Sequence, residues 1–266
     1  MPKRAISFSV YISVVLIFLF HSPPLHAHSQ TLLIPELTER GLPKRYIESV
    51  FNHPDFNRFR NPRLASCTGV RRGTPDYESV VRRGKINRAV DYYEKHKTAF
   101  EGVRNKVPAE YILAIIGTET NFGIYLGSCY VMRQLYSIYT QNRARKKRDF
   151  ALEQIAALLR VAQDQKWSTE KLLSLRGSSA GAFGLGHFIP TSFRFAVDGN
   201  KDGVINLEDP ADAIPSIANY LVRHGWDTNS PQKAIFRYNP DRKYVRKILD
   251  LADKIRDSIK KSPRAS

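Results

Sequence analysis

Apolar residues recur every three or four positions along most of the chain, which is the spacing of one face of a helix. Strand-like alternation is rare, and there is no internal repeat. Residues 52–76 lack the helical period and are predicted to be irregular. The sequence therefore predicts an α+β fold that is mainly α-helical, with helices over 43–51, 84–100, 128–140, 147–165, a short one from Thr169, 212–226 and 244–261.

One more helix is predicted to start at Pro108 and to carry an isolated glutamate on its apolar face. Proline at the first helical position is typical of a helix start. Glu119 follows Ile112, Ile115 and Ile116 by seven, four and three residues, which places it on their face. A glutamate at such a position usually reaches water or pairs with an arginine. Here desolvation and the negative helix end disfavour the charged form, so we expect a carboxyl group suited to general-acid catalysis.

The stretch RGSSAGAFGLGHFIPTSF, residues 176–193, combines closely spaced glycines with aromatic and aliphatic residues. Glycines at this density allow the backbone to approach a ligand closely. A phosphate-binding loop is excluded, because no Lys-Ser or Lys-Thr pair follows and the GxGxxG spacing is absent. The pattern favours a packed, irregular wall. His187 within it is either a site residue or an ordinary hydrogen-bonded histidine.

Residues 198–209, DGNKDGVINLED, match the calcium loop of an EF-hand, with Gly203 at the turn position. Asp209 stands where glutamate is usual, and its shorter side chain has less bidentate reach. A cage of six or more oxygens leaves no open position for substrate, so the predicted Ca²⁺ is structural. The predicted ligands are Asp198, Asn200, Asp202, Asn206, Asp209 and the carbonyl of Val204.

The first 27 residues have the features of a secretory signal peptide. Lys3 and Arg4 precede an apolar stretch over residues 10–20, and Leu25 and Ala27 form a cleavage signature. The stretch is shorter than the ~20 residues that span a bilayer, and no nearby cysteine supports lipid attachment. We expect a protein exported to the periplasm or cell envelope, with no stable membrane insertion after signal removal. An uncleaved N-terminal anchor is the alternative.

Charge and cysteine content narrow the choice of partner and compartment. The formal net charge is +17, which favours an anionic partner. For an exported protein, cell-wall polymers and anionic membrane surfaces fit better than nucleic acid, and a role in solubility alone is the alternative. Cys67 and Cys129 are the only cysteines. A disulfide between them would contribute roughly 4 kcal/mol, and the sequence leaves open whether they pair.

Four ordered segments resemble the lytic murein transglycosylase B family. They are VPAEYILAIIGTETNFG, GSSAGAFGLGHFIPTSF, AVDGNKDGVINLEDPADAIPSIANYLVRHGW and RYNPDRKYV, and they cover residues 107–245 densely. The likeness is weaker over residues 31–106. After the signal peptide predicted over 1–27, the resemblance implies an N-terminal helical region over 28–106, packed on a lysozyme-like catalytic domain over 107–266.

The resemblance also implies an activity: cleavage of the MurNAc–GlcNAc bond of peptidoglycan without water, giving 1,6-anhydro-MurNAc ends. In that family one glutamate, here Glu119, acts as acid and then as base. The N-acetyl group of the substrate supplies the nucleophile, an exception to the rule of two carboxylates. No organic cofactor is implied, and we expect a monomer.

The motifs assign further residues to the substrate. His187 stands where the family usually has glutamine, at a position expected to face substrate. The residues that the resemblance places along the cleft are Gly184, Gly186, Phe188, Pro190 and Ser192, and those near the reacting sugar are Tyr238 and Asn239.

Two alternatives to a lytic transglycosylase remain. One is a hydrolytic muramidase of the same fold, and the other is a non-catalytic peptidoglycan-binding protein.

Overall fold

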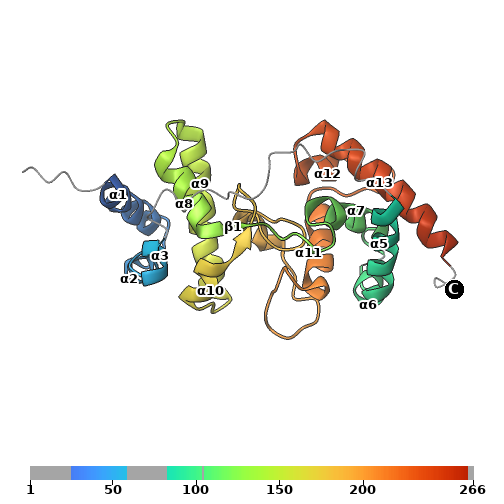
Figure 1. Cartoon of the computed structure of the whole chain (residues 1–266), viewed down its shortest axis with the longest axis horizontal. Helices are drawn as coiled ribbons and strands as arrows, with labels where there is room; N and C mark the ends of the chain where they lie inside the picture. Colours follow the sequence, from blue (N-terminus) through green and yellow to red (C-terminus); the bar gives the residue numbers. More distant parts are fainter. Residues whose placement is uncertain (1–24, 59–82, 104, 263–266) are drawn as a thin grey trace, which may run out of the picture.

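The computed structural model describes residues 25–58, 83–103 and 105–262 of the chain. Figure 1 shows two groups of helices with a less regular region between them. The first lobe contains α1 (Leu25–Glu39), α2 (Lys44–Phe51), α3 (Pro54–Arg58), α8 (Val131–Gln141), α9 (Arg145–Asp164) and α10 (Thr169–Ser174). The second lobe contains α5 (Arg83–Lys95), α6 (Lys97–Glu101), α7 (Ala109–Glu119), α11 (Pro210–Arg223), α12 (Gln232–Tyr238) and α13 (Arg242–Lys261). The central region contains β1 (Cys129–Tyr130), β2 (Arg176–Gly177) and the 3₁₀-helix η2 (Pro190–Phe195).

The mainly helical fold is confirmed, and each predicted helix has its counterpart. Three details differ. The predicted helix over 84–100 divides at His96 into α5 and α6. Part of the stretch predicted to be irregular forms α3, which buries Phe56, while residues 59–82 lie outside the described ones. Finally, α12 was not predicted. Helices of five and seven residues are too short to display a clear apolar period.

The two lobes meet through η2, which packs against α9 of the first lobe and α11 of the second. A side-chain amide holds each end of η2. The buried Gln154 on α9 accepts a hydrogen bond from the Thr191 backbone N–H at 3.0 Å. Asn219 on α11 donates to the Phe195 carbonyl at 2.9 Å. Phe193 of η2 also packs edge-on against Trp167. The relative position of the lobes therefore depends on this short segment.

The small sheet lies beside this junction. Strands β1 and β2 pair antiparallel with Cys129 opposite Gly177, and the Arg176 guanidinium lies 3.6 Å from the centre of the Tyr130 ring. Cys129 is disulfide-bonded, and the other cysteine of the chain, Cys67, lies outside the described residues. The sequence left open whether Cys129 forms a disulfide, and in the structure it does.

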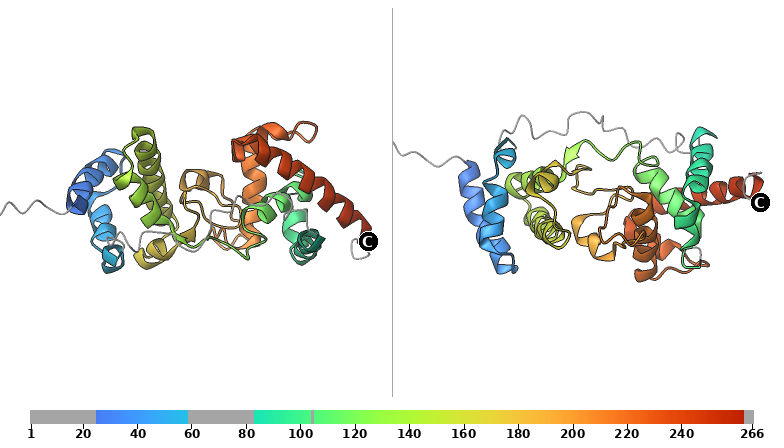
Figure 2. Two further views of the ribbon diagram at one scale, coloured as in Figure 1. Left: turned by 45° about the horizontal axis from the view of Figure 1, so that its top comes forward. Right: turned by 90° about the horizontal axis from the view of Figure 1, so that it is seen from below.

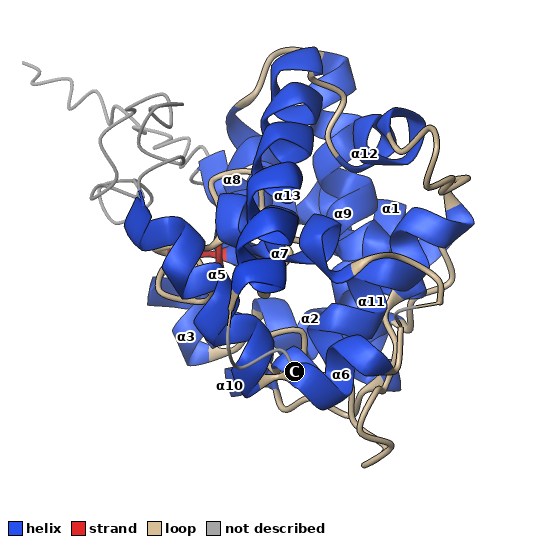
Figure 3. Cartoon of the chain, turned by 90° about the vertical axis from the view of Figure 1, so that its right-hand side faces the viewer, coloured by secondary structure: helices blue, strands red, loops and turns tan. Residues whose placement is uncertain are grey.

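Helix α7 is the buried centre of the second lobe. Every residue from Tyr111 to Gly117 is buried, and Ile112, Ile115 and Ile116 are fully inaccessible. Helix α13 lies along α7 and α5 packs beside both, as Figure 3 shows from the end of the molecule. A helix that is apolar all round has to be enclosed on all sides. This packing fixes the position of the C-terminal end of α7.

Two predictions about the N-terminal part of the chain stay predictions. The predicted signal peptide lies outside the described residues except for Leu25–Ala27, which begin α1. The boundary near residue 106 is also untested. Helices α1–α3 and α5–α6 come from the predicted N-terminal region but lie at opposite ends of the molecule in both views of Figure 2. Within the described ranges, no helix has the length and apolar character needed to cross a bilayer.

A glycine-to-alanine pair tests the packing at the sheet. A Cβ on Gly177 would lie 2.1 Å from the Ala182 carbonyl oxygen and 2.9 Å from Val131 Cγ2. We expect Gly177→Ala to lower the free energy of unfolding by roughly 1–3 kcal/mol, measured by chemical denaturation. Gly84→Ala is the control, because Gly84 is exposed in α5 with no atom within 4 Å of the added Cβ. Equal stability of the two variants would contradict the tight contact.

Candidate active site

Glu119 is the last residue of α7, and the chain leaves the helix through an unusual turn. Asn121 and Phe122 have φ angles of 52° and 61°, a region that residues other than glycine rarely adopt. Arg88 of α5 donates a hydrogen bond to Asn121 Oδ1 at 2.8 Å. The Phe122 ring packs on Gly117, where a Cβ would lie 2.7 Å from Cζ. Strained backbone of this kind, held by its surroundings, is typical of functional sites.

Thr120 connects this turn to the glycine-containing stretch. Its side chain is buried, and its hydroxyl lies 3.0 Å from the Leu185 carbonyl oxygen and 3.2 Å from that of Ile116. The Thr120 hydroxyl oxygen also accepts a hydrogen bond from the Gly123 N–H. Thr120 therefore fixes residues 185–187 against the end of α7. This residue could not be identified from the sequence, because a threonine near a helix end carries no signal for so distant a partner.

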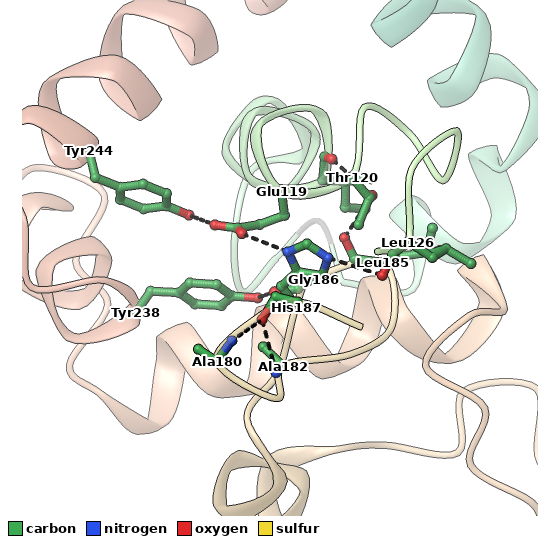
Figure 4. A network of polar contacts seen from close by, with 12 residues as sticks. Glu119, Thr120, Leu126, Ala180, Ala182, Leu185, Gly186, His187, Tyr238 and Tyr244 are labelled. Carbon is green, nitrogen blue, oxygen red and sulfur yellow. Dashed lines mark hydrogen bonds and ion pairs between the residues drawn. The ribbon is translucent and has the colours of Figure 1, made fainter. Parts of the chain in front are cut away.

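The carboxylate of Glu119 contacts two polar groups (Figure 4). The Tyr244 hydroxyl of α13 donates to Oε1 at 2.7 Å, and Nδ1 of His187 lies 3.3 Å from Oε2. The Glu119 side chain is 17% exposed, so a ligand can reach it. The sequence placed Glu119 on the apolar face of its helix, and the structure adds two polar contacts at its carboxylate. Because Glu119 ends α7, its carboxylate extends past the isoleucines to a place where other segments supply a hydroxyl and an imidazole.

Two tyrosines complete the polar group. The Tyr238 hydroxyl donates to the Gly186 carbonyl at 2.5 Å. Burial raises the pKa of Tyr238 and of Tyr244 well above the ordinary tyrosine value, and the charge of Glu119 raises both further. Both therefore remain neutral hydrogen-bond donors at physiological pH. The sequence indicated Tyr238 but not Tyr244, because the helical pattern over residues 244–261 does not show what its first residue would face.

The glycines serve internal packing. Gly184 has a φ of 76°, and a Cβ there would lie 2.5 Å from the Cβ of Leu207. A Cβ on Gly186 would lie 2.6 Å from the Tyr238 hydroxyl. We predicted close approach to a ligand, but protein atoms fill the space beside both residues. A side chain at position 186 would displace the tyrosine from the site.

The remaining predicted substrate residues lie at different depths. Phe188 and Pro190 are buried, and the Phe188 ring packs edge-on against Tyr238 with ring centres 5.8 Å apart. Their buried side chains therefore support the residues of the site. Ser192 is half-buried within η2, and Asn239 is exposed at the end of α12. Neither has a described contact with Glu119, so their assignment to substrate stays a prediction.

The loop at 198–209 turns several oxygens toward the same backbone groups. Asp198 Oδ1 and Asn200 Oδ1 accept from the Asp202 N–H at 3.2 and 3.1 Å, and Asp198 Oδ2 accepts from the Gly203 N–H at 2.8 Å. Asp202 Oδ1 accepts from the Val204 N–H at 2.8 Å. The donor set of carboxylate and amide oxygens is the one that Ca²⁺ prefers. The residues present therefore fit a calcium loop.

Two aspartates at the end of this loop have structural contacts. Asp209 Oδ1 accepts from the Ala211 N–H and so caps α11. Asp212 is buried, and its two oxygens accept from the N–H groups of Gly199 and Asn206 at 2.8 and 2.7 Å. Asp212, which holds the loop through these two hydrogen bonds, was not identified from the sequence. Within the described residues, no group of three or more His, Cys, Asp or Glu side chains is already gathered around one point.

Raised tyrosine pKa values predict a loss of stability in alkali. The folded protein keeps the protons of Tyr238 and Tyr244 at a pH where the unfolded chain releases them. Their stabilising contribution is therefore complete below about pH 10 and falls as the pH rises further. We expect Tyr244→Phe to reduce this decline by up to about 1.4 kcal/mol per pH unit. The free energy of unfolding between about pH 9 and pH 11 tests this. Tyr125→Phe, at an exposed position, should change the slope little.

Known proteins share both the sequence and the fold. The model of the transglycosylase SLT domain family matches residues 26–244. The membrane-bound lytic murein transglycosylase B of Escherichia coli (strain K12) is 42% identical over 121 residues, which cover 45% of this chain and 32% of that relative. The chain thus spans about a third of the length of this curated relative.

Two solved structures have the same fold. The soluble lytic transglycosylase SltB1 of Pseudomonas aeruginosa has a TM-score of 0.71 and 25% identity, over 89% of this chain and 99% of that one. The lytic transglycosylase Slt35 of Escherichia coli, solved in complex with calcium, has a TM-score of 0.71 and 21% identity, over 90% and 95% of the two chains. At this identity the second comparison shows the fold alone.

These matches confirm the lysozyme-like fold class and the resemblance carried by the four sequence segments. The family match extends from α1 into α13 and so includes both lobes and Glu119. The chain belongs to the transglycosylase SLT domain family.

Proposed function

We propose that this protein is an exported lytic transglycosylase that cleaves the MurNAc–GlcNAc bond of peptidoglycan and leaves 1,6-anhydro-MurNAc ends. The observation that carries the proposal is the carboxyl group of Glu119, held at the end of the buried helix α7 and open to solvent on one side. Its described polar contacts are Tyr244 and His187, and neither is a second acid. One carboxyl group is what a substrate-assisted reaction requires.

In the proposed reaction, Glu119 first acts as an acid. Its proton passes to the glycosidic oxygen as the bond from that oxygen to the anomeric carbon breaks. The carbonyl oxygen of the substrate N-acetyl group bonds to the anomeric carbon. The Glu119 carboxylate then accepts the proton of the C6 hydroxyl, whose oxygen displaces the acetamido oxygen and closes the anhydro ring. Tyr244 keeps Oε1 hydrogen-bonded, so Oε2 is the oxygen that exchanges the proton.

The residues around Glu119 have two proposed roles. Gly184, Gly186, Phe188 and Pro190 would shape the wall, since they are buried. The half-buried or exposed residues would contact the sugars directly, and these are His187, Ser192, Tyr238 and Asn239.

We also propose that the loop at 198–209 holds one structural Ca²⁺. The ion would be held by side-chain oxygens and one carbonyl, and it would stabilise the loop that precedes α11. The negative charge of three aspartates would be compensated by the bound ion. The proposed ligands are Asp198, Asn200, Asp202, Asn206, Asp209 and the carbonyl of Val204.

A basic surface supports an anionic wall as partner. A groove of about 780 Å³ between α12 and α13 is lined in part by apolar residues, among them the exposed Phe236. No acidic residue lines it, and the cations around it are Lys233, Arg237, Arg242 and Arg246. Such a surface would attract the carboxylates of a cell-wall polymer, and salt would weaken that attraction. Action in the periplasm or cell envelope fits this surface and the predicted signal peptide.

Replacing the acid tests the reaction. Purified sacculi are digested with the mature protein and with Glu119→Gln, and released muropeptides are identified by mass spectrometry. We expect anhydro-muramyl ends from the wild type and a loss of at least about 100-fold in the variant, because an amide cannot donate the proton. Glu110→Gln is the matched control, because Glu110 lies in the first turn of the same helix. Reducing ends would indicate a hydrolytic muramidase, and no release would indicate a peptidoglycan-binding protein.

Calcium binding is tested by stability. Because the ion binds the folded loop, Ca²⁺ at about 100 times its Kd should raise the free energy of unfolding by about 2.7 kcal/mol. Asp202→Asn should abolish this increase, since it removes a carboxylate ligand. Glu208→Gln should keep it, because Glu208 is an exposed loop residue outside the ligand set. Titration calorimetry provides a second measurement, and a wild type without a calcium response would refute the site.

A further inference from the structure

We propose that His187 and Glu119 share one proton through Nδ1 and Oε2, so that the histidine sets the pH range in which the glutamate can act as an acid. The inference rests on the proposed function of Glu119 and extends it. His187 is a positioning residue in this proposal, because it acts through the glutamate.

The fold holds the imidazole in one orientation. His187 has a φ of 47°, and its backbone N–H donates to the Gly184 carbonyl at 3.1 Å. On the far side of the ring, Nε2 lies 3.3 Å from the Leu126 carbonyl oxygen. A carbonyl oxygen only accepts hydrogen bonds, so Nε2 carries a hydrogen. The tautomer follows from this contact: in the neutral ring, Nδ1 has the free lone pair.

The nitrogen that carries this lone pair lies close to the carboxyl group. Nδ1 lies 3.3 Å from Glu119 Oε2, and the two side chains are only 14% and 17% exposed. Two lone pairs at this distance repel each other unless a proton lies between them. Either the carboxyl group donates to Nδ1 or the imidazolium donates to the carboxylate, and both arrangements contain one proton. The contact therefore favours a pair that keeps one proton.

The surrounding groups leave this pair as the titrating unit. Tyr244 from α13 donates to the other oxygen, Oε1, and burial raises the pKa of Tyr244 and of Tyr238 far above neutral. Lys247 on α13 interacts electrostatically with Glu119, and Lys85 on α5 interacts with Lys247. Burial and the charge of Lys85 lower the pKa of Lys247, and Glu119 opposes that shift.

The pair returns to its starting state in each reaction cycle. The proton on Oε2 passes to the glycosidic oxygen, which leaves a carboxylate beside neutral His187. The C6 hydroxyl of the muramic sugar then returns one proton to Oε2 as its oxygen closes the ring. No net proton is lost from the pair. The enzyme is competent while the resting pair holds its proton, and loss of that proton at higher pH ends activity.

The first test measures the protonation of the His187 ring nitrogens and requires no enzyme activity. In protein labelled with ¹⁵N-histidine, the His187 nitrogens are assigned by their absence in His187→Gln. We expect Nε2 to remain protonated throughout, and the Nδ1 signal to titrate at a pH that moves by about one unit or more in Glu119→Gln. A ring with a proton on Nδ1 alone, or a titration unaffected by Glu119→Gln, would overturn the proposal.

The second test reads the pH dependence of muropeptide release. Glutamine can still hydrogen-bond but does not titrate, so His187→Gln should be active at acidic pH. Its activity should decline at a pH about one unit or more below that of the wild type, because interacting groups titrate as a pair. His53→Gln is the matched control. Nε2 of His53 also contacts a glutamate, Glu170, at 3.1 Å, but in the first lobe and away from the site.

The possible outcomes separate this proposal from the proposed function. An unchanged profile in a folded His187→Gln variant would overturn the shared proton while leaving Glu119 as the acid. Loss of activity at every pH in a folded variant would also overturn it, because it would leave His187 only its proposed contact with the sugar. If the wild type releases no anhydro-muropeptides, the proposed function fails, and the nitrogen titration still decides whether the pair exists.

Discussion

Enclosure of α7 on all sides is the constraint on which the site depends. A helix with no polar face has one stable location, inside the second lobe, and its two ends are then the only places where it can present a polar side chain. The end formed by Glu119 faces the region between the lobes, where α13 and the glycine-containing stretch also meet. Tyr244 and His187 are brought to the carboxylate by the same packing that buries the isoleucines. Stability and chemistry therefore depend on one set of contacts.

The sequence predicted the long helices well, because each has an apolar face that repeats over several turns. It also indicated Glu119 and the 198–209 loop, since both depend on local spacing. The short helices α3 and α12 were not predicted, because they display too little of the period. Tyr244 is 125 residues away from its partner Glu119 in the sequence. The contacts of Asp212 and Thr120 likewise form only when the chain folds. Such pairings leave no local pattern, so a single sequence could not reveal them.

The glycines illustrate how one composition supports two physical interpretations. Closely spaced glycines are equally consistent with a backbone that approaches a ligand and with one that approaches another part of the protein. Only the neighbours decide between these, and here Leu207 and the Tyr238 hydroxyl occupy the space. The same caution applies to Glu119, whose isoleucine neighbours in sequence correctly predicted the buried helix but not the polar groups at its end.

The two side-chain amides that hold η2 have a consequence for how the lobes can move. Gln154 and Asn219 hold the two ends of one short segment from opposite lobes, and the helices of each lobe pack mainly on one another. A rotation of one lobe against the other would therefore turn about η2 without disturbing either helical core. Because Thr120 holds residues 185–187 against the end of α7, such a hinge would leave this wall of the site with the second lobe. Glu119 and His187 would then stay in contact while the first lobe moves.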